Sequence, residues 1–318
     1  AGHEVVLLDD LSGTSAVAAQ RVERITGKSA PLVVGNAADD EVVESAFAYH
    51  GPIDAIIHFA AFKAVGESTQ KPLEYYANNL DTTFALLRVG LAHGIRSFVF
   101  SSTGTVYSDP ADLPFTEEST TSVDLSNAYS KSKRMNEVVL ADVARVNPDV
   151  NVTVLRYFNP VGAHTSGLIG EDPTGIPNNL MPYVSRVAIG ALERIGVFGD
   201  DYDTPDGTGL RDYIHVVDLA DGHVSALEKA APGYAVYNLG TGRPVSVLEL
   251  ISSFEKAVGR KLPTQILDRR PGDVAATYCD PAKAERELGW KARFGIDEAS
   301  RDYWTWQSQN PQGYATAE

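Results

Sequence analysis

The sequence predicts an α/β protein that combines a doubly wound parallel sheet with a smaller α+β capping domain. Short apolar runs such as residues 5–8 and 97–101 are separated by amphipathic helical patterns, which is typical of strands buried on both faces. Acidic, amide or hydroxyl residues follow several of these runs, where ligands bind in such sheets. Residues 162–175 are rich in Gly, Pro and His without sustained periodicity, and this change indicates the start of the smaller domain.

The first predicted strand, residues 5–8, ends in Asp9 and Asp10. An acidic side chain at the tip of a parallel strand can bind the ribose hydroxyls of an adenosine and repel the 2′-phosphate of NADP. An ordinary solvated aspartate is the alternative. The glycine-rich phosphate-binding turn of such a fold lies about twenty residues ahead of this acidic residue. We therefore expect a first strand and its turn to precede Ala1 in the natural polypeptide.

Two more predicted strands carry candidate cofactor contacts. Residues 32–36 form the first, and Asn36 can hydrogen-bond an adenine edge. Residues 53–61 form the second and end in small residues, which let the backbone approach a ligand closely. Lys63 follows directly, either as a surface lysine or as a cofactor contact.

A hydroxyl-rich strand end and a helical Tyr-x-x-x-Lys pair form the candidate catalytic group. The strand at residues 97–101 leads to Thr103, and Tyr129 and Lys133 share one face of a predicted helix. A neighbouring ammonium favours the phenolate and lowers the pKa of a tyrosine, which makes it usable as a general base. With 14 Tyr and 27 Lys plus Arg, about one such pair is expected by chance. A solvated helix face therefore stays open as the alternative.

The second half of the chain begins after a strand at residues 152–156. Residues 212–216 and 236–240 read as strands that flank a helix and can return to the main sheet. Residues 269–273 form a basic turn in an acidic protein, which is either a phosphate clamp or a solvated loop.

The composition excludes several classes of function. A net charge of −15 argues against nucleic-acid binding and requires that any anionic substrate meet local arginines. No His, Cys or carboxylate cluster has metal-ligand spacing, and no apolar run is long enough for a membrane span. The single cysteine, Cys279, excludes an intrachain disulfide and is typical of a reducing compartment. We expect a cytoplasmic protein.

Taken together, the motifs resemble the extended short-chain dehydrogenase/reductases, and among these the UDP-glucose (UDP-galactose) 4-epimerase family. The resemblance runs from one end of the chain to the other and implies a Rossmann-like NAD-binding domain at residues 1–158, to which 211–241 can belong, and a UDP-sugar-binding domain at 159–318. The matching segments are residues 8–11, 58–68, 71–78, 129–133, 155–164, 170–182, 206–216 and 304–314.

The resemblance implies reversible epimerisation at C4 of UDP-hexoses through a 4-keto sugar, with NAD that stays bound. Tyr129 would take the proton of the sugar 4-hydroxyl with the help of Thr103, and Lys133 would bridge the nicotinamide ribose. The implied cofactor contacts further include Asp9, Asp10, Asn36, Phe59, Ala60, Lys63, Asn78, Tyr157 and Phe158. The implied UDP-sugar contacts are Thr103, Asn159, Asn178, Asn179, Leu180, Phe198, Arg211, Arg270, Asp273 and Thr277.

The resemblance also implies a homodimer, formed through the helices near residues 73–93 and 129–146, and a small residue, Thr277, that would admit N-acetylated sugars. The chain departs from the family pattern in three places. Thr103 replaces the usual serine, Asn36 the usual aspartate, and the glycine-rich turn is absent.

Two other functions remain open. A dehydratase or decarboxylase of the same fold is one, although a dehydratase needs a carboxylate pair where Gly104 and Thr105 stand. An NAD-binding protein without activity is the other.

Overall fold

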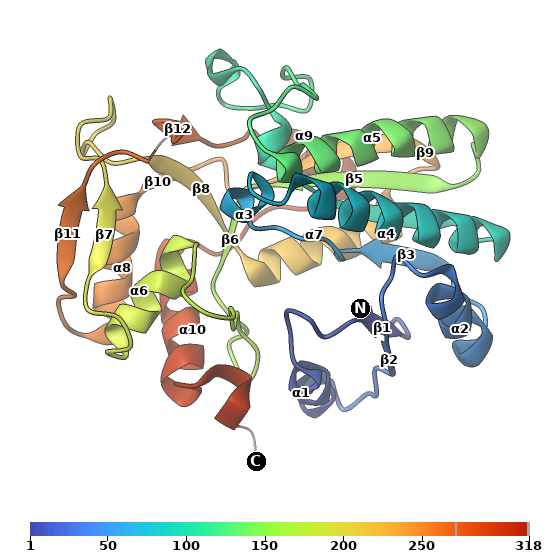
Figure 1. The fold of residues 1–318 in the computed structure, drawn as a ribbon, viewed down its shortest axis with the longest axis horizontal. Coiled ribbons are helices and arrows are strands. Elements are labelled where there is room, and N and C mark those ends of the chain that lie inside the picture. The colour runs from blue at the N-terminus through green and yellow to red at the C-terminus, as the bar shows by residue number, and fades with distance from the viewer. Residues whose placement is uncertain (271, 317–318) are drawn as a thin grey trace.

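The main sheet consists of four parallel strands in the order β3-β4-β5-β9 (Figure 1). This computed structural model describes residues 1–270 and 272–316. Strand pairing is continuous across the sheet, so that the carboxyl ends of β4 and β5 meet with Thr103 opposite Tyr157. The four strands are β3 (Ala55–His58), β4 (Ser97–Thr103), β5 (Asn151–Tyr157) and β9 (Gly233–Leu239).

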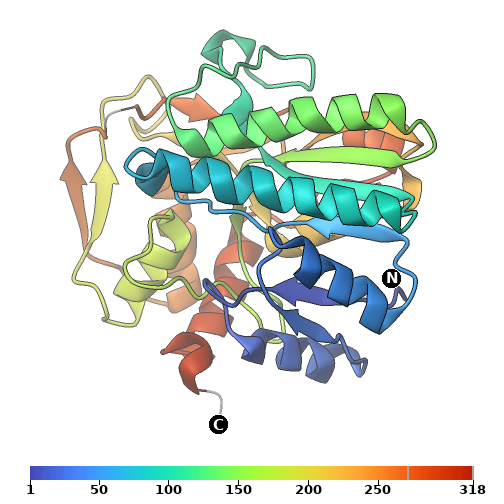
Figure 2. The ribbon, with the colours of Figure 1, turned by 45° about the vertical axis from the view of Figure 1, so that its right-hand side comes forward.

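Both faces of this sheet are covered, which confirms the predicted α/β class. Helices α4 (Pro72–Ala92) and α5 (Ala128–Val146) lie side by side on one face (Figure 2). There Phe98 and Phe100 of β4 pack with Leu140 of α5. On the other face, Val99 packs with residues of α7 (Val216–Lys229) and α9 (Ala282–Leu288). Alternate side chains of one strand thus enter two cores.

A separate pair of parallel strands, β1 (Leu7–Asp9) and β2 (Leu32–Val34), forms the N-terminal part of the fold with helices α1 (Ala16–Thr26) and α2 (Asp40–His50). The side chains of Ser15 and Asp39 cap these helices. Among the described residues, neither β1 nor β3 has a second neighbouring strand. The expected strand ahead of Ala1 stays a prediction.

The second half of the chain builds a smaller lobe around β8 (Leu210–His215). This strand pairs with β6 (Asn159–Val161), β10 (Pro244–Ser246) and β12 (Ala276–Thr277). Strands β7 (Ile195–Phe198) and β11 (Thr264–Leu267) form a second ladder. A core containing Met181, Phe254 and Trp306 joins them to helices α6 (Leu180–Ala188), α8 (Val247–Val258) and α10 (Ile296–Gln309).

The two strands that flank α7 belong to different sheets, which corrects part of the sequence reading. Strand β9 pairs with β5 in the main sheet, whereas β8 pairs with β6, β10 and β12. Buried Asp212 gives one reason, since its carboxylate accepts hydrogen bonds from the backbone of Thr241 and Gly242 beside β10. The proposed division of the chain near residue 158 therefore has to allow for later segments, namely α7, β9 and α9, that return to the main sheet.

The shorter helices lie in connections. They are α3 (Val65–Ser68), η1 (Gly104–Val106), η2 (Pro110–Asp112) and η3 (Gly313–Thr316). In the part of the chain that the structure describes, no helix has both the length and the apolar character needed to cross a membrane.

Candidate active site

The structure brings Thr103 and Tyr129 into contact. Strand β4 ends at Thr103, and α5 begins one residue before Tyr129. The side chain of Asn127 caps α5 by accepting a hydrogen bond from Ser130 N at 2.8 Å. The Thr103 hydroxyl lies beside the Tyr129 phenol and lowers its pKa, against the effect of burial. The cap thus fixes the turn of helix that holds the phenol at the end of the main sheet.

Lys133 lies one turn further along α5, but its ammonium is not directed toward the Tyr129 phenol. The side chain is buried. Its Nζ donates to Ser101 O at 2.8 Å and lies 4.8 Å from the centre of the Phe100 ring. Burial lowers the pKa of Lys133 to about 7, against the opposing field of Glu137. Lys133 is therefore buried and Tyr129 half-buried, so the Tyr-x-x-x-Lys pair is not a solvated helix face.

The predicted lowering of the Tyr129 pKa is wrong for this structure. Burial raises the pKa of the phenol strongly, Tyr157 and Tyr75 add to this rise, and the hydrogen bond from Thr103 opposes it. Removing water from around a phenolate outweighs one hydrogen bond, and the Lys133 ammonium is directed to Ser101 O. The phenolate consequently needs additional positive charge in the site.

A buried carboxylate that the sequence reading missed lies next to these residues. Glu137 accepts a hydrogen bond from Ser102 Oγ at 2.6 Å and two from Arg156, from Nε at 2.9 Å and from Nη2 at 2.7 Å. Arg134 Nη1 donates a further one at 3.0 Å. The spacing of Glu137 four residues after Lys133 was the available signal. This carboxylate fastens β4, β5 and α5 together.

Several expected cofactor contacts lie at strand ends. Asp9 ends β1, and its Oδ1 accepts from Leu11 N at 2.8 Å. The Asp10 carboxylate accepts from the backbone and hydroxyl of Ser12. Asn36 follows β2, and its Oδ1 accepts from Ala38 N at 2.9 Å. Because β1 and β2 are parallel, these three side chains follow the same edge of their sheet.

The remaining expected cofactor contacts surround the ends of β3 and β5. Phe59 and Ala60 follow β3, and Phe59 is exposed with its ring 4.6 Å from that of His223. The other four make contacts in the protein. Lys63 Nζ is 3.8 Å from a carboxylate oxygen of Glu171, and the Asn78 side chain donates a hydrogen bond to Asn79. Tyr157 OH is hydrogen-bonded to Ser101 Oγ. Phe158 stacks with Tyr107 and Phe115.

Lys133 and Asp9 can each make further hydrogen bonds beyond those in the protein, which is suited to binding a dinucleotide. The Lys133 ammonium has three donors, and among the described residues it makes one hydrogen bond, to Ser101 O. Asp9 Oδ2 accepts no hydrogen bond within the described part of the chain, whereas Oδ1 is used by Leu11 N. A buried ammonium and a strand-end carboxylate with free capacity suit the hydroxyls of two riboses.

Most of the expected UDP-sugar contacts lie on the smaller lobe, whereas Thr103 lies at the end of β4 in the main sheet. Arg270 Nε donates to Asp273 at 3.0 Å, and its guanidinium lies 4.6 Å from the Phe198 ring centre. Arg211 Nη2 lies 4.0 Å from the Asp273 carboxylate. Pro271, in the middle of this turn, lies outside the described residues. The structure thus supports a cluster of two arginines beside an aromatic ring, which is suited to a phosphate and a base.

Strand pairing connects the cluster of Arg211, Arg270 and Phe198 to the main sheet. Asn159 in β6 lies opposite Tyr213 in β8, two residues from Arg211. Asn159 itself follows Tyr157, which pairs with Thr103. Thr277 lies opposite Arg211 in the β12–β8 ladder, so that both side chains are on one face of the sheet. Asn178 precedes the N-cap residue of α6, Asn179, whose side chain makes no capping hydrogen bond, and Leu180 begins the helix.

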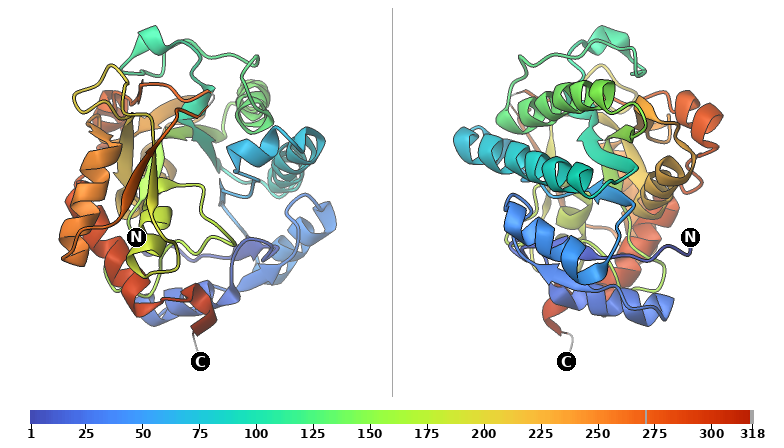
Figure 3. Two further views of the ribbon diagram at one scale, coloured as in Figure 1. Left: turned by 60° about the vertical axis from the view of Figure 1, so that its left-hand side comes forward. Right: turned by 90° about the vertical axis from the view of Figure 1, so that its right-hand side faces the viewer.

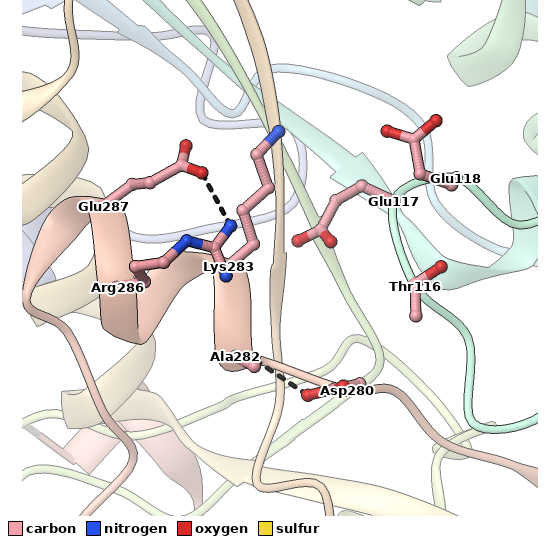
Figure 4. A pocket seen from close by; sticks show the side chains of 8 residues that line it. All are labelled: Thr116, Glu117, Glu118, Asp280, Ala282, Lys283, Arg286 and Glu287. Atoms are coloured by element: carbon pink, nitrogen blue, oxygen red, sulfur yellow. Dashed lines mark hydrogen bonds and ion pairs between the residues drawn. The ribbon is translucent and has the colours of Figure 1, made fainter.

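A charged hollow lies apart from these residues (Figure 4). Glu117 and Lys283 extend toward each other from its two walls, and Glu117 Oε1 accepts from Asn238 N at 2.7 Å. In the described ranges, no group of His, Cys, Asp and Glu is arranged to hold a metal ion. The lining residues are Thr116, Glu117, Glu118, Asp280, Ala282, Lys283, Arg286 and Glu287.

A parallel sheet whose carboxyl edge carries Thr103 beside Tyr129, with a buried lysine one helical turn further on, is typical of an extended short-chain dehydrogenase/reductase. The family described as the NAD dependent epimerase/dehydratase family matches residues 1–240, and the chain belongs to this family. The resemblance seen in the motifs is thereby confirmed.

Individual relatives are similar over nearly the whole chain. The UDP-glucose 4-epimerase of Bacillus subtilis is 53% identical and is aligned over 100% of this chain and 93% of its own length. That of Caenorhabditis elegans is 48% identical over 99% and 93%. The solved structure of UDP-glucose 4-epimerase from Bifidobacterium longum, in complex with NAD+ and UDP, superposes with a TM-score of 0.93 at 52% identity, covering 98% of this chain and 93% of that one.

Proposed function

We propose that this chain catalyses the reversible epimerisation at C4 of UDP-hexoses, interconverting UDP-galactose and UDP-glucose, with NAD as cofactor. The observation that carries the proposal is the position of Thr103 beside Tyr129 at the carboxyl end of the main sheet. Thr103 pairs with Tyr157 of β5, and β6, which follows directly along the chain, pairs with β8, the strand of Arg211. Full-length similarity of about half the residues to UDP-glucose 4-epimerases supports the same reaction.

NAD, when bound, accepts a hydride from C4 of the sugar and returns it. Lys133 and Asp9 are the residues with free capacity for its ribose hydroxyls. Tyr129 accepts the proton of the 4-hydroxyl and returns it later in the turnover, since it is the ionisable group hydrogen-bonded to Thr103. Burial of the phenol holds its pKa high, so that the positively charged nicotinamide favours the basic form of Tyr129.

Arg211 and Arg270 neutralise the diphosphate of the substrate. The protein carries a net charge of −15, so an anionic substrate is repelled at long range and needs a local cationic site. The Asp273 carboxylate lies 4.0 Å from Arg211 Nη2 and 3.0 Å from Arg270 Nε, and it thereby keeps the two guanidinium groups close together. Phe198 offers a ring face next to Arg270 on which a uracil can stack.

Thr277 sets the space available to the substituent at C2 of the sugar. Its β12–β8 register places it on the same face as Arg211. Its side chain is also much smaller than that of a tyrosine, which at this position would exclude N-acetylhexosamines. The protein therefore also interconverts UDP-GlcNAc and UDP-GalNAc. A solved UDP-Glc/GlcNAc 4-epimerase from Campylobacter jejuni, 32% identical with a TM-score of 0.82, supports this dual specificity.

The specificity test is Thr277→Tyr. We expect the variant to lose activity on UDP-GalNAc while largely keeping its activity on UDP-galactose. Thr264→Tyr, an equal change at an exposed strand position, is the matched control. Wild-type protein that is active on UDP-galactose and inert toward UDP-GalNAc would show that another residue excludes the larger sugar.

The protein works as a homodimer in the cytoplasm. Support for the dimer comes from the outer surface of α4 and α5, where Leu73, Val138 and Val146 are exposed apolar side chains. Support for a reducing compartment comes from the single free cysteine, Cys279.

The decisive experiment incubates the purified protein with NAD and UDP-galactose and identifies the product. UDP-glucose is expected. A 4-keto-6-deoxy sugar would establish the dehydratase alternative. Bound NAD without any product would establish the inactive alternative. Gly104 and Thr105, which offer no carboxylate after Thr103, already disfavour dehydration.

A further inference from the structure

Three hydroxyls form a chain that ends at the proposed base. Ser130 Oγ donates to Thr105 Oγ1 at 2.8 Å, and Thr105 Oγ1 lies 3.1 Å from Thr103 Oγ1. The Thr103 hydroxyl in turn lies beside the Tyr129 phenol and favours its ionised form. Ser130 and Thr103 are buried, whereas Thr105 is exposed. The three residues come from α5, η1 and the end of β4.

One arrangement of the protons directs every bond in this chain toward Tyr129. A hydroxyl has one donor and two acceptor sites. Ser130 uses its proton on Thr105, so that the Thr105 proton is free to go to Thr103. Thr103 Oγ1 also accepts from Thr105 N at 3.2 Å. Both acceptor sites of Thr103 are then filled, and its own proton is left for the oxygen of Tyr129.

We propose that Ser130 and Thr105 are positioning residues that orient the Thr103 hydroxyl to donate to the Tyr129 oxygen. The inference rests on the proposed function, because it gives Tyr129 the role of the base. A hydroxyl that can only donate stabilises the phenolate and cannot stabilise the neutral phenol as an acceptor. The arrangement thereby selects the form of Tyr129 that takes a proton.

The other ionisable groups around Tyr129 do not stabilise its phenolate in place of the Thr103 hydroxyl. On α5 itself, Lys133 is directed to Ser101 O, and Glu137 is paired with Arg156 of β5. Tyr75 on α4 and Tyr157 at the end of β5 both raise the pKa of Tyr129. Tyr75 donates its own proton to Glu67 of α3. The Thr103 hydroxyl is the interaction that favours phenolate among the described residues.

The test is the pH dependence of kcat for UDP-galactose epimerisation by the NAD-loaded full chain. A base must be deprotonated, so activity rises with pH through its pKa. Thr105→Val should move this rise to higher pH by about half to one unit, which lowers kcat on the acidic side about three- to tenfold. Ser130→Ala should move it in the same direction by less. Thr105→Ser restores the hydroxyl and should restore the wild-type profile.

Ser132→Ala is the matched control. Ser132 is also a buried hydroxyl on α5, and it donates to the backbone oxygen of Tyr129 at 2.8 Å, outside the hydroxyl chain. Its loss should lower the thermal stability without moving the pH profile. An equal shift in Ser132→Ala, or superimposable profiles for Thr105→Val and wild type, would overturn the inference.

A second readout separates this inference from the proposed function. Tyrosine labelled with ¹³C at Cζ reports the Tyr129 pKa in the NAD-loaded protein, and the resonance is assigned from its absence in Tyr129→Phe. We expect a higher pKa in Ser130→Ala than in wild type. An active Tyr129→Phe refutes the proposed base, whereas an inactive Tyr129→Phe with an unchanged pKa in Ser130→Ala refutes only the hydroxyl chain. If Thr105→Val does not fold, Ser130→Ala carries the test.

Discussion

Among single residues, Tyr129 is the proposed base, and burial of its phenol opposes ionisation. We predict that Tyr129→Phe lowers kcat by about 10²–10⁴-fold, which is the usual contribution of a positioned acid or base. The ring stays in place and one oxygen is lost, so NAD and UDP should still bind. Steady-state kinetics together with NAD titration check this. A variant with near-normal turnover would show that another group takes the proton.

Lys133 is a proposed cofactor contact that the fold holds at a cost in stability. Its pKa is about 7 in the folded protein and about 10.5 in an unfolded chain. Between these values the unfolded chain binds a proton that the folded chain does not, so the group destabilises the fold increasingly as the pH falls from 10.5 to 7. Below 7 both states are protonated and the penalty stays constant.

We therefore predict that Lys133→Met makes the cofactor-free protein more stable while abolishing epimerisation. The gain in free energy of unfolding should be about 2 kcal/mol or more at pH 7, and it should shrink toward pH 10. Urea unfolding at pH 6, 8 and 10 measures the difference from wild type. Lys131→Met, a more accessible change on the same helix, is the control. A gain that is independent of pH would contradict the assigned pKa.

At the level of secondary-structure elements, Glu137 connects three of them by hydrogen bonds. It joins Ser102 of β4, the residue before Thr103, and Arg156 of β5 to α5. We predict that Glu137→Gln lowers the free energy of unfolding by about 3 kcal/mol, because it leaves the Arg156 charge buried without a counter-charge. Urea unfolding measures the loss.

The double variant Glu137→Gln with Arg156→Met tests the cause of that loss. Removing both charges should recover much of the stability, since no buried charge is left unpaired. Recovery of stability without recovery of kcat would indicate that the pair also positions Thr103 and Tyr129. Additive losses would instead show that Glu137 and Arg156 stabilise the protein independently.

In the molecule as a whole, Arg21 connects the N-terminal part with the smaller lobe. It is the buried residue of α1. Its Nη1 donates to Leu168 O and Asn310 Oδ1, each at 2.8 Å, and its guanidinium lies 5.0 Å from the Tyr314 ring centre. Figure 3 shows the C-terminal segment beside α1 in both views.

We predict that Arg21→Met lowers the free energy of unfolding by about 2 kcal/mol, since it removes two hydrogen bonds of a buried cation and a contact with aromatic rings. Arg24→Met, an exposed change on the same helix, should have almost no effect. Urea unfolding compares the two variants. Equal stability of Arg21→Met and Arg24→Met would mean that α1 contributes little to holding the lobes together.

Local sequence patterns were sufficient for the α/β class and for the positions of several elements. Apolar runs located β4 and β5, and helical spacing located α4 and the shared face of Tyr129 and Lys133. These predictions succeeded because side-chain periodicity depends on the local backbone geometry alone. The shorter strands of the smaller lobe, such as β6 and β12, carry too few residues for any period to be visible.

The assembled fold was needed for everything that depends on which elements pack together. It placed β8 outside the main sheet, gave Glu137 its partners in two strands, and aligned Ser130 with Thr105 from a different element. It also reversed the sign predicted for the Tyr129 pKa. The reason is that desolvation and long-range hydrogen bonds arise only when distant segments meet, and the spacing of residues along one helix contains no information about them.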